Sequence, residues 1–165
     1  RIASASVSRM IETMGAVAAD LAPSRRRPIA ADQALCVART CYDHVAGRLG
    51  VAIAERLQAE EAVILTDEGG ALTERGEARL IGLGLDIGAL RTQRRVFCRP
   101  CLDWTERKNH IAGAVGAALC DRFLASGWVA RQAHSRALEI LPEGYEGFRD
   151  VFGIDPLTLG GRDPA

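Results

Sequence analysis

An internal duplication is the feature that most limits what this 165-residue chain can fold into. The segment His44-Val-Ala-Gly47 recurs 66 residues later as His110-Ile-Ala-Gly113, and the match continues downstream at the same offset. Cys41-x-Asp43 and Cys101-x-Asp103 also correspond, at an offset of 60, so six residues have entered the second copy before its histidine. A chain with such repeats is expected to fold as related halves that pack on each other.

Helical spacing and turn residues give a similar order of elements in the two copies. The first copy is expected to contain a helical stretch from Asp32 that includes Cys41, a helix from about Val45 to Glu60, a hairpin over 62–72, a helix over 74–83 capped by Thr73, and a short helix capped by Asp86. The second copy is expected to contain a helix over about 105–126, strands at 128–131 and 137–141, and a helix over 142–152.

Glycines recur three residues apart in both copies, as Gly47 and Gly50 and as Gly113 and Gly116. Glycine costs about 1 kcal/mol relative to alanine inside a helix, so each pair indicates either close helix contact or a helix boundary. We therefore predict a mainly α fold with short β-hairpins, made of two tandem winged-helix-like units behind an amphipathic dimerisation helix. The predicted segments are a dimerisation and linker helix at 1–22, a linker at 23–31, units at 32–92 and 93–156, and a disordered tail at 157–165.

The first helix is amphipathic, with apolar residues three and four positions apart. They include Val7, Met10, Ile11 and Met14. This face packs either on the body of the domain or on a second copy of itself in a homodimer, where both methionines would form an adaptable contact.

Composition excludes several classes of protein. Acidic and basic residues balance at 21 each, so no overall charge draws the chain to nucleic acid or to an anionic membrane. No apolar run reaches the roughly 18 residues of a membrane span, and no signal peptide is visible. Five cysteines without an export signal favour reduced thiols, so we predict a cytoplasmic protein. Without a nucleophile motif, a catalytic carboxylate pair or a phosphate loop, we predict that it is not an enzyme.

Cysteine spacing points to a metal site. Cys98 and Cys101 have the spacing of a metal knuckle, and Cys41 and His44 would share one face if they lie on a helix. The four are a candidate tetrahedral site for zinc or another thiophilic metal. Two alternatives stay open, namely a redox pair of Cys98 with Cys101 and cysteines that serve only as small buried hydrophobic residues.

The histidines occupy equivalent positions in the two copies. One interpretation is helix capping or a buried hydrogen bond to the neighbouring aspartate. The other is that the duplicated Cys-x-Asp and His elements meet across a pseudo-twofold axis and line an effector pocket. Its candidate residues are Tyr42, Asp43, Asp103, Trp104 and His110.

A basic stretch lies between the two units. Its arginines Arg91, Arg94 and Arg95 are candidates for nucleic-acid contact. The neutral overall charge makes direct DNA binding by the two units the weaker hypothesis.

Two segments centred on cysteines carry a family resemblance. They read Ala38-Arg-Thr-Cys-Tyr-Asp-His-Val-Ala-Gly-Arg-Leu-Gly50 and Arg99-Pro-Cys-Leu-Asp-Trp-Thr-Glu-Arg107, the second leading into His110-Ile-Ala-Gly113. With Leu72-Thr73 and Gly84-Leu-Asp86, they make the chain resemble the C-terminal region of long bacterial ArsR-type helix-turn-helix regulators. The resemblance implies a dimeric transcriptional regulator or repressor whose winged-helix DNA-binding domain precedes Arg1 and contacts operator DNA.

The function predicted from these observations is that of an effector-sensing and dimerisation region of an ArsR-type regulator. The effector would be a small molecule or a metal bound between the units, altering the DNA affinity of the dimer. The alternatives are a purely structural or oligomerisation module without a ligand, and a thiol or metal-binding sensor domain.

Overall fold

A computed structural model describes residues 7, 10–11, 14, 30–66 and 69–160 of the chain. This part is about half helical, and its strands form short antiparallel pairs. The predicted class of a mainly helical chain with short hairpins is therefore confirmed. The tandem winged-helix-like organisation of the two units stays a prediction.

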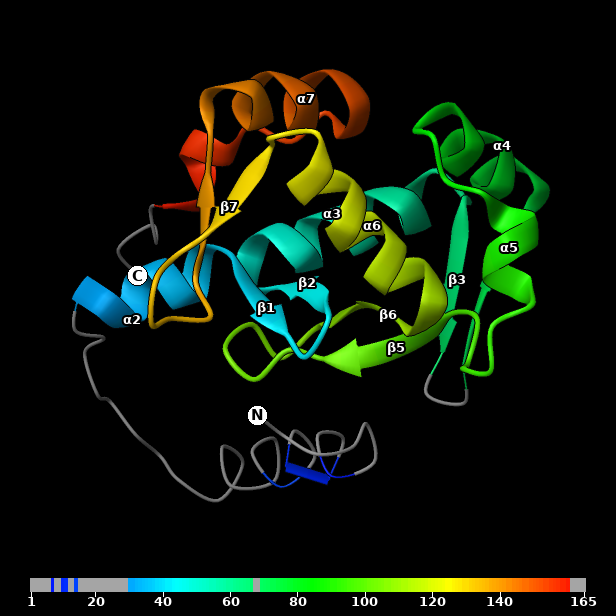
Figure 1. Cartoon of the computed structure of the whole chain (residues 1–165), viewed down its shortest axis with the longest axis horizontal. Coiled ribbons are helices and arrows are strands. Elements are labelled where there is room, and N and C mark those ends of the chain that lie inside the picture. The colour runs from blue at the N-terminus through cyan, green and yellow to red at the C-terminus, as the bar shows by residue number, and fades with distance from the viewer. Residues whose placement is uncertain (1–6, 8–9, 12–13, 15–29, 67–68, 161–165) are drawn as a thin grey trace.

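The two repeats contain the same order of elements from their first hairpin onward (Figure 1). The first repeat contains α2 (Ala30–Val37), β1 (Arg39–Cys41), β2 (His44–Ala46), α3 (Gly47–Ala59), β3 (Val63–Thr66), β4 (Gly69–Leu72), α4 (Glu74–Gly82) and α5 (Ile87–Arg91). The second contains β5 (Arg99–Leu102), β6 (Asn109–Ala112), α6 (Gly113–Ala125), β7 (Val129–Arg131), β8 (Leu138–Ile140), α7 (Pro142–Phe152) and the 3-10 helix η1 (Pro156–Leu159). Each repeat thus runs hairpin, helix, hairpin, helix and then a short helix.

Three helices begin where their capping residues predict. The side chain of Thr73 accepts a hydrogen bond from the Gly76 amide at 3.2 Å at the start of α4. The side chain of Asp86 accepts one from the Ala89 amide at 2.9 Å at the start of α5. Pro142 occupies the first turn of α7, where its missing N–H group removes no helical hydrogen bond. Local capping chemistry therefore placed these helix starts correctly.

The two central helices start later than predicted. The helices expected over 45–60 and 105–126 are α3 and α6, which begin at Gly47 and Gly113. The residues before each glycine form the second strand of a hairpin instead. Both glycines have positive φ angles, 78° and 85°, a conformation that glycine adopts readily and that separates strand from helix. Of the two roles proposed for the glycines, these two therefore mark boundaries.

The helical stretch expected from Asp32 to beyond Cys41 is also wrong, because α2 ends at Val37. Cys41 and His44 do not share a helix face. They lie directly opposite each other in the hairpin of β1 and β2, whose turn includes Tyr42 in the left-handed region at φ 58°. A three-residue strand carries too little alternation to be distinguished from helical spacing in the sequence.

The two repeats contact each other reciprocally. Helix α3 packs on β6, and α6 packs on β2. A β carbon added to Gly50 would lie 3.6 Å from the β carbon of His110, and one added to Gly116 would lie 3.2 Å from that of His44. Such reciprocity is the mark of a twofold relationship. In Figure 1, α3 and α6 occupy the centre, with α7 above them and α4 and α5 at the right.

Strands of each repeat also lie beside strands of the other repeat. The Leu138 amide donates to the Ala38 carbonyl at 2.9 Å, and the Thr40 amide donates to the Arg136 carbonyl at 2.8 Å. Strand β1 of the first repeat therefore lies along β8 of the second. Strand β5 of the second repeat likewise lies along β4 of the first. The first hairpin of each repeat thus packs against the other repeat.

A single hydrophobic cluster spans both repeats. Leu49 and Leu57 of α3 pack with Phe123 of α6 and with Phe148 and Phe152 of α7, and all five are at most 1% exposed. No helix in the described part of the chain is long and apolar enough to span a bilayer. Residues 23–29 of the predicted linker, most of the predicted first helix, and residues 161–165 of the predicted tail lie outside the described residues. Residues 157–159 of that tail belong to η1.

Candidate functional site

Four side chains that bind soft metals meet where the repeats join. They are Cys41 and His44 from the first hairpin and Cys101 and His110 from the third. The two sulfurs are 4.0 Å apart, the two Nε2 atoms are 3.1 Å apart, and all four atoms lie within 4.8 Å of one another. No member is more than 6% exposed. We call these four residues the Cys/His cluster.

Strand register explains how each hairpin presents its pair. Cys41 is the cross-strand partner of His44, and Cys101 is the cross-strand partner of His110. Side chains of directly opposed residues point to the same face of a hairpin. Ala46 and the equivalent Ala112 are fully buried and pack with the two cysteines, which lets the two hairpin faces approach closely.

Each histidine has a carboxylate behind it. His44 Nδ1 is hydrogen-bonded to Asp43 Oδ1 at 3.3 Å. His110 Nδ1 lies 3.7 Å from Asp103 Oδ2. The sequence offered two interpretations of the histidines, contact with the neighbouring aspartate or a meeting across a pseudo-twofold axis. The structure combines them, because Nδ1 faces the carboxylate while Nε2 faces the other repeat.

Asp103 anchors the third hairpin to the first repeat. Arg39 Nη2 donates to both of its carboxylate oxygens at 2.8 Å, and the Gly47 amide at the start of α3 donates at 2.7 Å. Burial alone would raise the pKa of Asp103, but the Arg39 charge and these hydrogen bonds, with one from Thr105, hold the pKa at about 2. Arg39 is only 1% exposed, so this is a buried ion pair.

Sequence reasoning missed Arg39, although a signal for it exists. An arginine stands two residues before the cysteine in both copies, as Arg39-x-Cys41 and Arg99-x-Cys101. The two arginines differ in the structure, because Arg39 is buried against Asp103 whereas Arg99 is partly exposed.

The aspartate of the first repeat is closer to the surface. Asp43 pairs with the Arg95 guanidinium at 2.6 Å and is about one-third exposed. Its burial acts to raise the pKa, but hydrogen bonds with His44 and Arg95 lower the pKa to about 2. Both aspartates behind the cluster are therefore ionised and matched by an arginine.

The cluster favours a thiolate on one cysteine. A hydrogen bond from Cys41 lowers the pKa of Cys101 most; burial opposes it, and His110 and His44 lower it further, so the pKa falls far below its usual value. Burial would lower the pKa of His44, but its hydrogen bonds with Asp43 and Cys101 raise it above the usual value. The two shifts have a shared cause, because the Cys101 thiol and the His44 imidazole interact with each other.

The two other buried thiols with resolved shifts behave in the opposite way. Burial raises the pKa of Cys98 and of Cys120 to about 11, so both stay protonated at neutral pH. Cys98, predicted as a metal ligand, packs in the main hydrophobic cluster. It lies in a bend directly before β5, and it is not among the four residues whose ligand atoms come together. In the structure, His110 is the fourth member of the cluster, where the sequence predicted Cys98.

The residues predicted to form an effector pocket have contrasting environments. Asp103 and His110 are fully buried, whereas Tyr42 is 50% exposed and Trp104 is 44% exposed. The Arg39 guanidinium lies 4.7 Å from the centre of the Trp104 ring, so this tryptophan covers the outer side of the buried ion pair.

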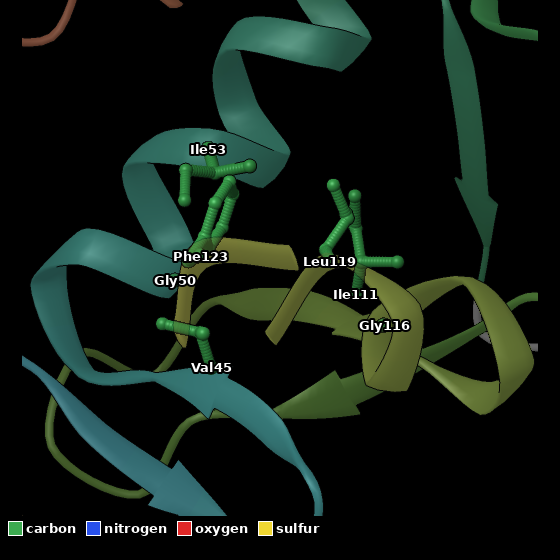
Figure 2. A pocket seen from close by; sticks show the side chains of 7 residues that line it. All are labelled: Val45, Gly50, Ile53, Ile111, Gly116, Leu119 and Phe123. Atoms are coloured by element: carbon green, nitrogen blue, oxygen red, sulfur yellow. The ribbon is translucent and has the colours of Figure 1, made fainter. Parts of the chain in front are cut away.

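A small cavity lies between α3 and α6 (Figure 2). Its lining is apolar and consists of Val45, Gly50, Ile53, Ile111, Gly116, Leu119 and Phe123. None of the predicted effector residues lines it. At about 10 Å³ it has room for roughly one water molecule, so it is too small for an organic effector.

The arginines predicted to contact nucleic acid are on the surface, and two of them have acidic partners. Arg91 pairs with Glu77 and lies 4.4 Å from the centre of the Phe97 ring. Arg95 is the partner of Asp43, and Arg94 is exposed.

The chain is similar to a curated bacterial protein. It is 39% identical over 117 residues to the uncharacterized HTH-type transcriptional regulator YdfF of Bacillus subtilis (strain 168). The alignment covers 71% of this chain and 52% of the relative, so the chain spans about half the length of the regulator it matches. No family model matches the chain, and no solved structure matches it.

Proposed function

We propose that this chain is the signal-receiving part of an HTH-type transcriptional regulator of the ArsR type, and that the Cys/His cluster receives the signal. The similarity to an HTH-type transcriptional regulator over half of its length supports the regulatory role. In this proposal, operator recognition belongs to the helix-turn-helix part of the regulator, and the repeats described above set its activity.

The position of the cluster is the observation that carries the proposal. Two of its side chains come from each repeat, and β2 and β6, which hold the two histidines, pack on the central helix of the opposite repeat. A ligand or a chemical change at the cluster therefore acts on the junction of both halves. A ligand that binds one state of the regulator more tightly than the other shifts the regulator toward that state.

The first helix supplies the proposed dimer contact. Met10, Ile11 and Met14 are helical and at least 50% exposed. We assign this face to the contact between two copies in a homodimer. The double variant Met10→Lys, Met14→Lys should therefore be a monomer when its mass is measured by light scattering. Unchanged mass in that variant would contradict the assignment.

The regulatory proposal is tested in the full-length regulator with a reporter for its own target promoter. Cells carrying wild-type protein, Cys41→Ser or Cys101→Ser are exposed to soft metal salts and to thiol oxidants. We expect the wild type to respond and both variants to stay in one transcriptional state while they still bind operator DNA. Cys98→Ser and Cys120→Ser are matched controls, because these thiols are equally buried but lie outside the cluster. Equal responses in all five proteins would mean that the signal is received elsewhere.

A further inference from the structure

We propose that the Cys/His cluster binds one metal ion of the zinc class, held tetrahedrally by two sulfurs and two imidazole nitrogens at the junction of the repeats. The assignment of a ligand stands on geometry. Its regulatory consequence rests on the proposed function above.

The spacing of the ligand atoms fits such an ion. Zinc to sulfur bonds of about 2.3 Å and zinc to nitrogen bonds of about 2.0–2.1 Å at tetrahedral angles place two sulfurs ~3.8 Å apart and two nitrogens ~3.3 Å apart. The observed separations are 4.0 Å for the sulfurs and 3.1 Å for the nitrogens. The widest separation, at most 4.8 Å, would contract by about 1 Å, within the reach of small side-chain rotations.

The histidines are oriented as metal ligands. Both point Nε2 into the cluster, and His44 Nδ1 is hydrogen-bonded to Asp43, the arrangement by which proteins fix the tautomer of a metal-binding histidine. His110 Nδ1 lies 3.7 Å from Asp103 and makes no hydrogen bond within the described part of the chain. The two Nε2 atoms lie 3.1 Å apart, close to the separation expected of two nitrogen ligands on one ion. A metal ion between them would replace this direct contact of the two imidazoles.

The charges of the site balance when the ion is present. Two thiolates neutralise a divalent ion, while Asp103 and Asp43 are neutralised by Arg39 and Arg95. Burying the loaded site therefore leaves no net charge without a counter-charge, which is the condition for placing ions in a protein interior. Loading Zn²⁺ displaces two protons from the neutral cluster, so the net charge of the protein does not change.

The ligand types select the class of ion and its role. Thiolate with imidazole suits Zn²⁺, whereas Mg²⁺ and Ca²⁺ prefer oxygen ligands. All four positions are buried protein groups, so the site is closed in the manner of structural zinc centres, and no position is left for a reacting water. The ion would fasten β2 to β6 and thereby fix the relation of the two repeats.

Cobalt substitution tests the site on the full chain, purified under reducing conditions and stripped of metal. Adding Co²⁺ should produce the intense visible bands of tetrahedral cobalt and a thiolate-to-cobalt charge-transfer band, both saturating at one equivalent. Zn²⁺ should abolish these bands. X-ray absorption of the zinc form should give two sulfur and two nitrogen neighbours.

Variants identify the ligands. Cys101→Ser and His110→Gln should lose the tetrahedral spectrum, while Cys98→Ser should keep it, with circular dichroism confirming that each variant is folded. Asp43→Asn removes only the carboxylate behind a ligand and should weaken binding by roughly 10–100-fold. A folded wild-type protein that gives no tetrahedral spectrum would overturn the proposal. Loss in Cys98→Ser with retention in His110→Gln, or uptake of Cu⁺ alone by the two sulfurs, would overturn the assigned ligand set.

The reporter experiment separates this proposal from the regulatory one. Stoichiometric metal binding without any metal effect on transcription would leave a structural metal site and refute the sensory role. A transcriptional response that needs Cys41 and Cys101 in a protein that binds no metal would keep the sensory role and refute the metal site.

Discussion

At the scale of single residues, the ion pair of Arg39 with Asp103 is almost completely buried, with side chains 1% and 0% exposed. Removing one partner of such a pair leaves the other charge buried without compensation, which costs about 3–5 kcal/mol. Asp103→Asn should therefore lower the free energy of unfolding by about that amount in urea denaturation. Asp43→Asn is the control, because its partner Arg95 is exposed and its loss should cost under about 1 kcal/mol. Equal losses in the two variants would contradict this account.

The same carboxylate gives the fold a dependence on acid. The pKa of Asp103 is about 2 in the folded chain, against an ordinary value of 3.8 for an aspartate side chain. A lowered pKa contributes stability above pH ~4, and that stability is lost as the pH falls through 4 toward 2. The shift corresponds to roughly 2 kcal/mol. Denaturation of metal-free protein at several pH values should show this loss, and Asp103→Asn should flatten the curve. An identical acid dependence in that variant would assign the effect to other groups.

The metal site expected from the cysteine spacing stays a prediction, although three of its four residues lie close together. Cys41, His44 and Cys101 were placed together in one candidate site, and the structure does bring them together. His110 was assigned to a separate pocket, because the familiar spacing of Cys98 and Cys101 supplied a fourth ligand. Spacing does not reveal which face of an extended chain a cysteine occupies, whereas the equivalence of His44 and His110 would have done so.

At the scale of elements, the close packing of α3 and α6 on the strand that precedes each of them depends on two glycines. A β carbon at Gly50 would lie 2.4 Å from the Val45 carbonyl oxygen, and one at Gly116 would lie 2.3 Å from the Ile111 carbonyl oxygen. Since backbone would have to move, each change to alanine should destabilise the chain by roughly 1–3 kcal/mol in thermal or urea unfolding.

A third glycine is the control for those two substitutions. Gly82 lies in α4 with nothing within 4 Å of an added β carbon. Gly82→Ala should leave stability unchanged or raise it by up to about 1 kcal/mol, because alanine is the better helix former. Destabilisation of Gly82→Ala as large as that of Gly50→Ala would contradict the steric explanation.

Elements with strong local signals were predicted, and the short hairpins of the site were not. Helices α4, α5 and α7 follow a capping residue or a proline, and their starts were correct. Strands β1 and β2 contain three residues each and form through contacts with the other repeat, including hydrogen bonds from Thr40 and Leu138. Their sequence alone suggests a helix. They form strands because contacts with the rest of the fold determine their conformation.

At the scale of the whole molecule, the repeats depend on each other, because the first hairpin of each repeat packs against the other repeat. Fragments 30–92 and 93–160, expressed separately, should each be largely unfolded, because each would lose the sheet edge and the hydrophobic partner that the other supplies. Mixing them should restore the amide spectrum of the intact chain in nuclear magnetic resonance. A dispersed, native-like spectrum from either fragment alone would show that the repeats are independent domains.

The reciprocal packing of the repeats has an evolutionary consequence. One repeat carries one cysteine and one histidine on a single hairpin face, which is half of a four-ligand centre. An ancestral gene encoding one copy would have produced the whole centre by self-association across the same axis. Fusion of two genes would then have freed the halves to diverge, as the six-residue insertion beside Trp104 and the different surroundings of Arg39 and Arg99 illustrate. In this account, the two repeats of the chain correspond to the two subunits of an ancestral dimer.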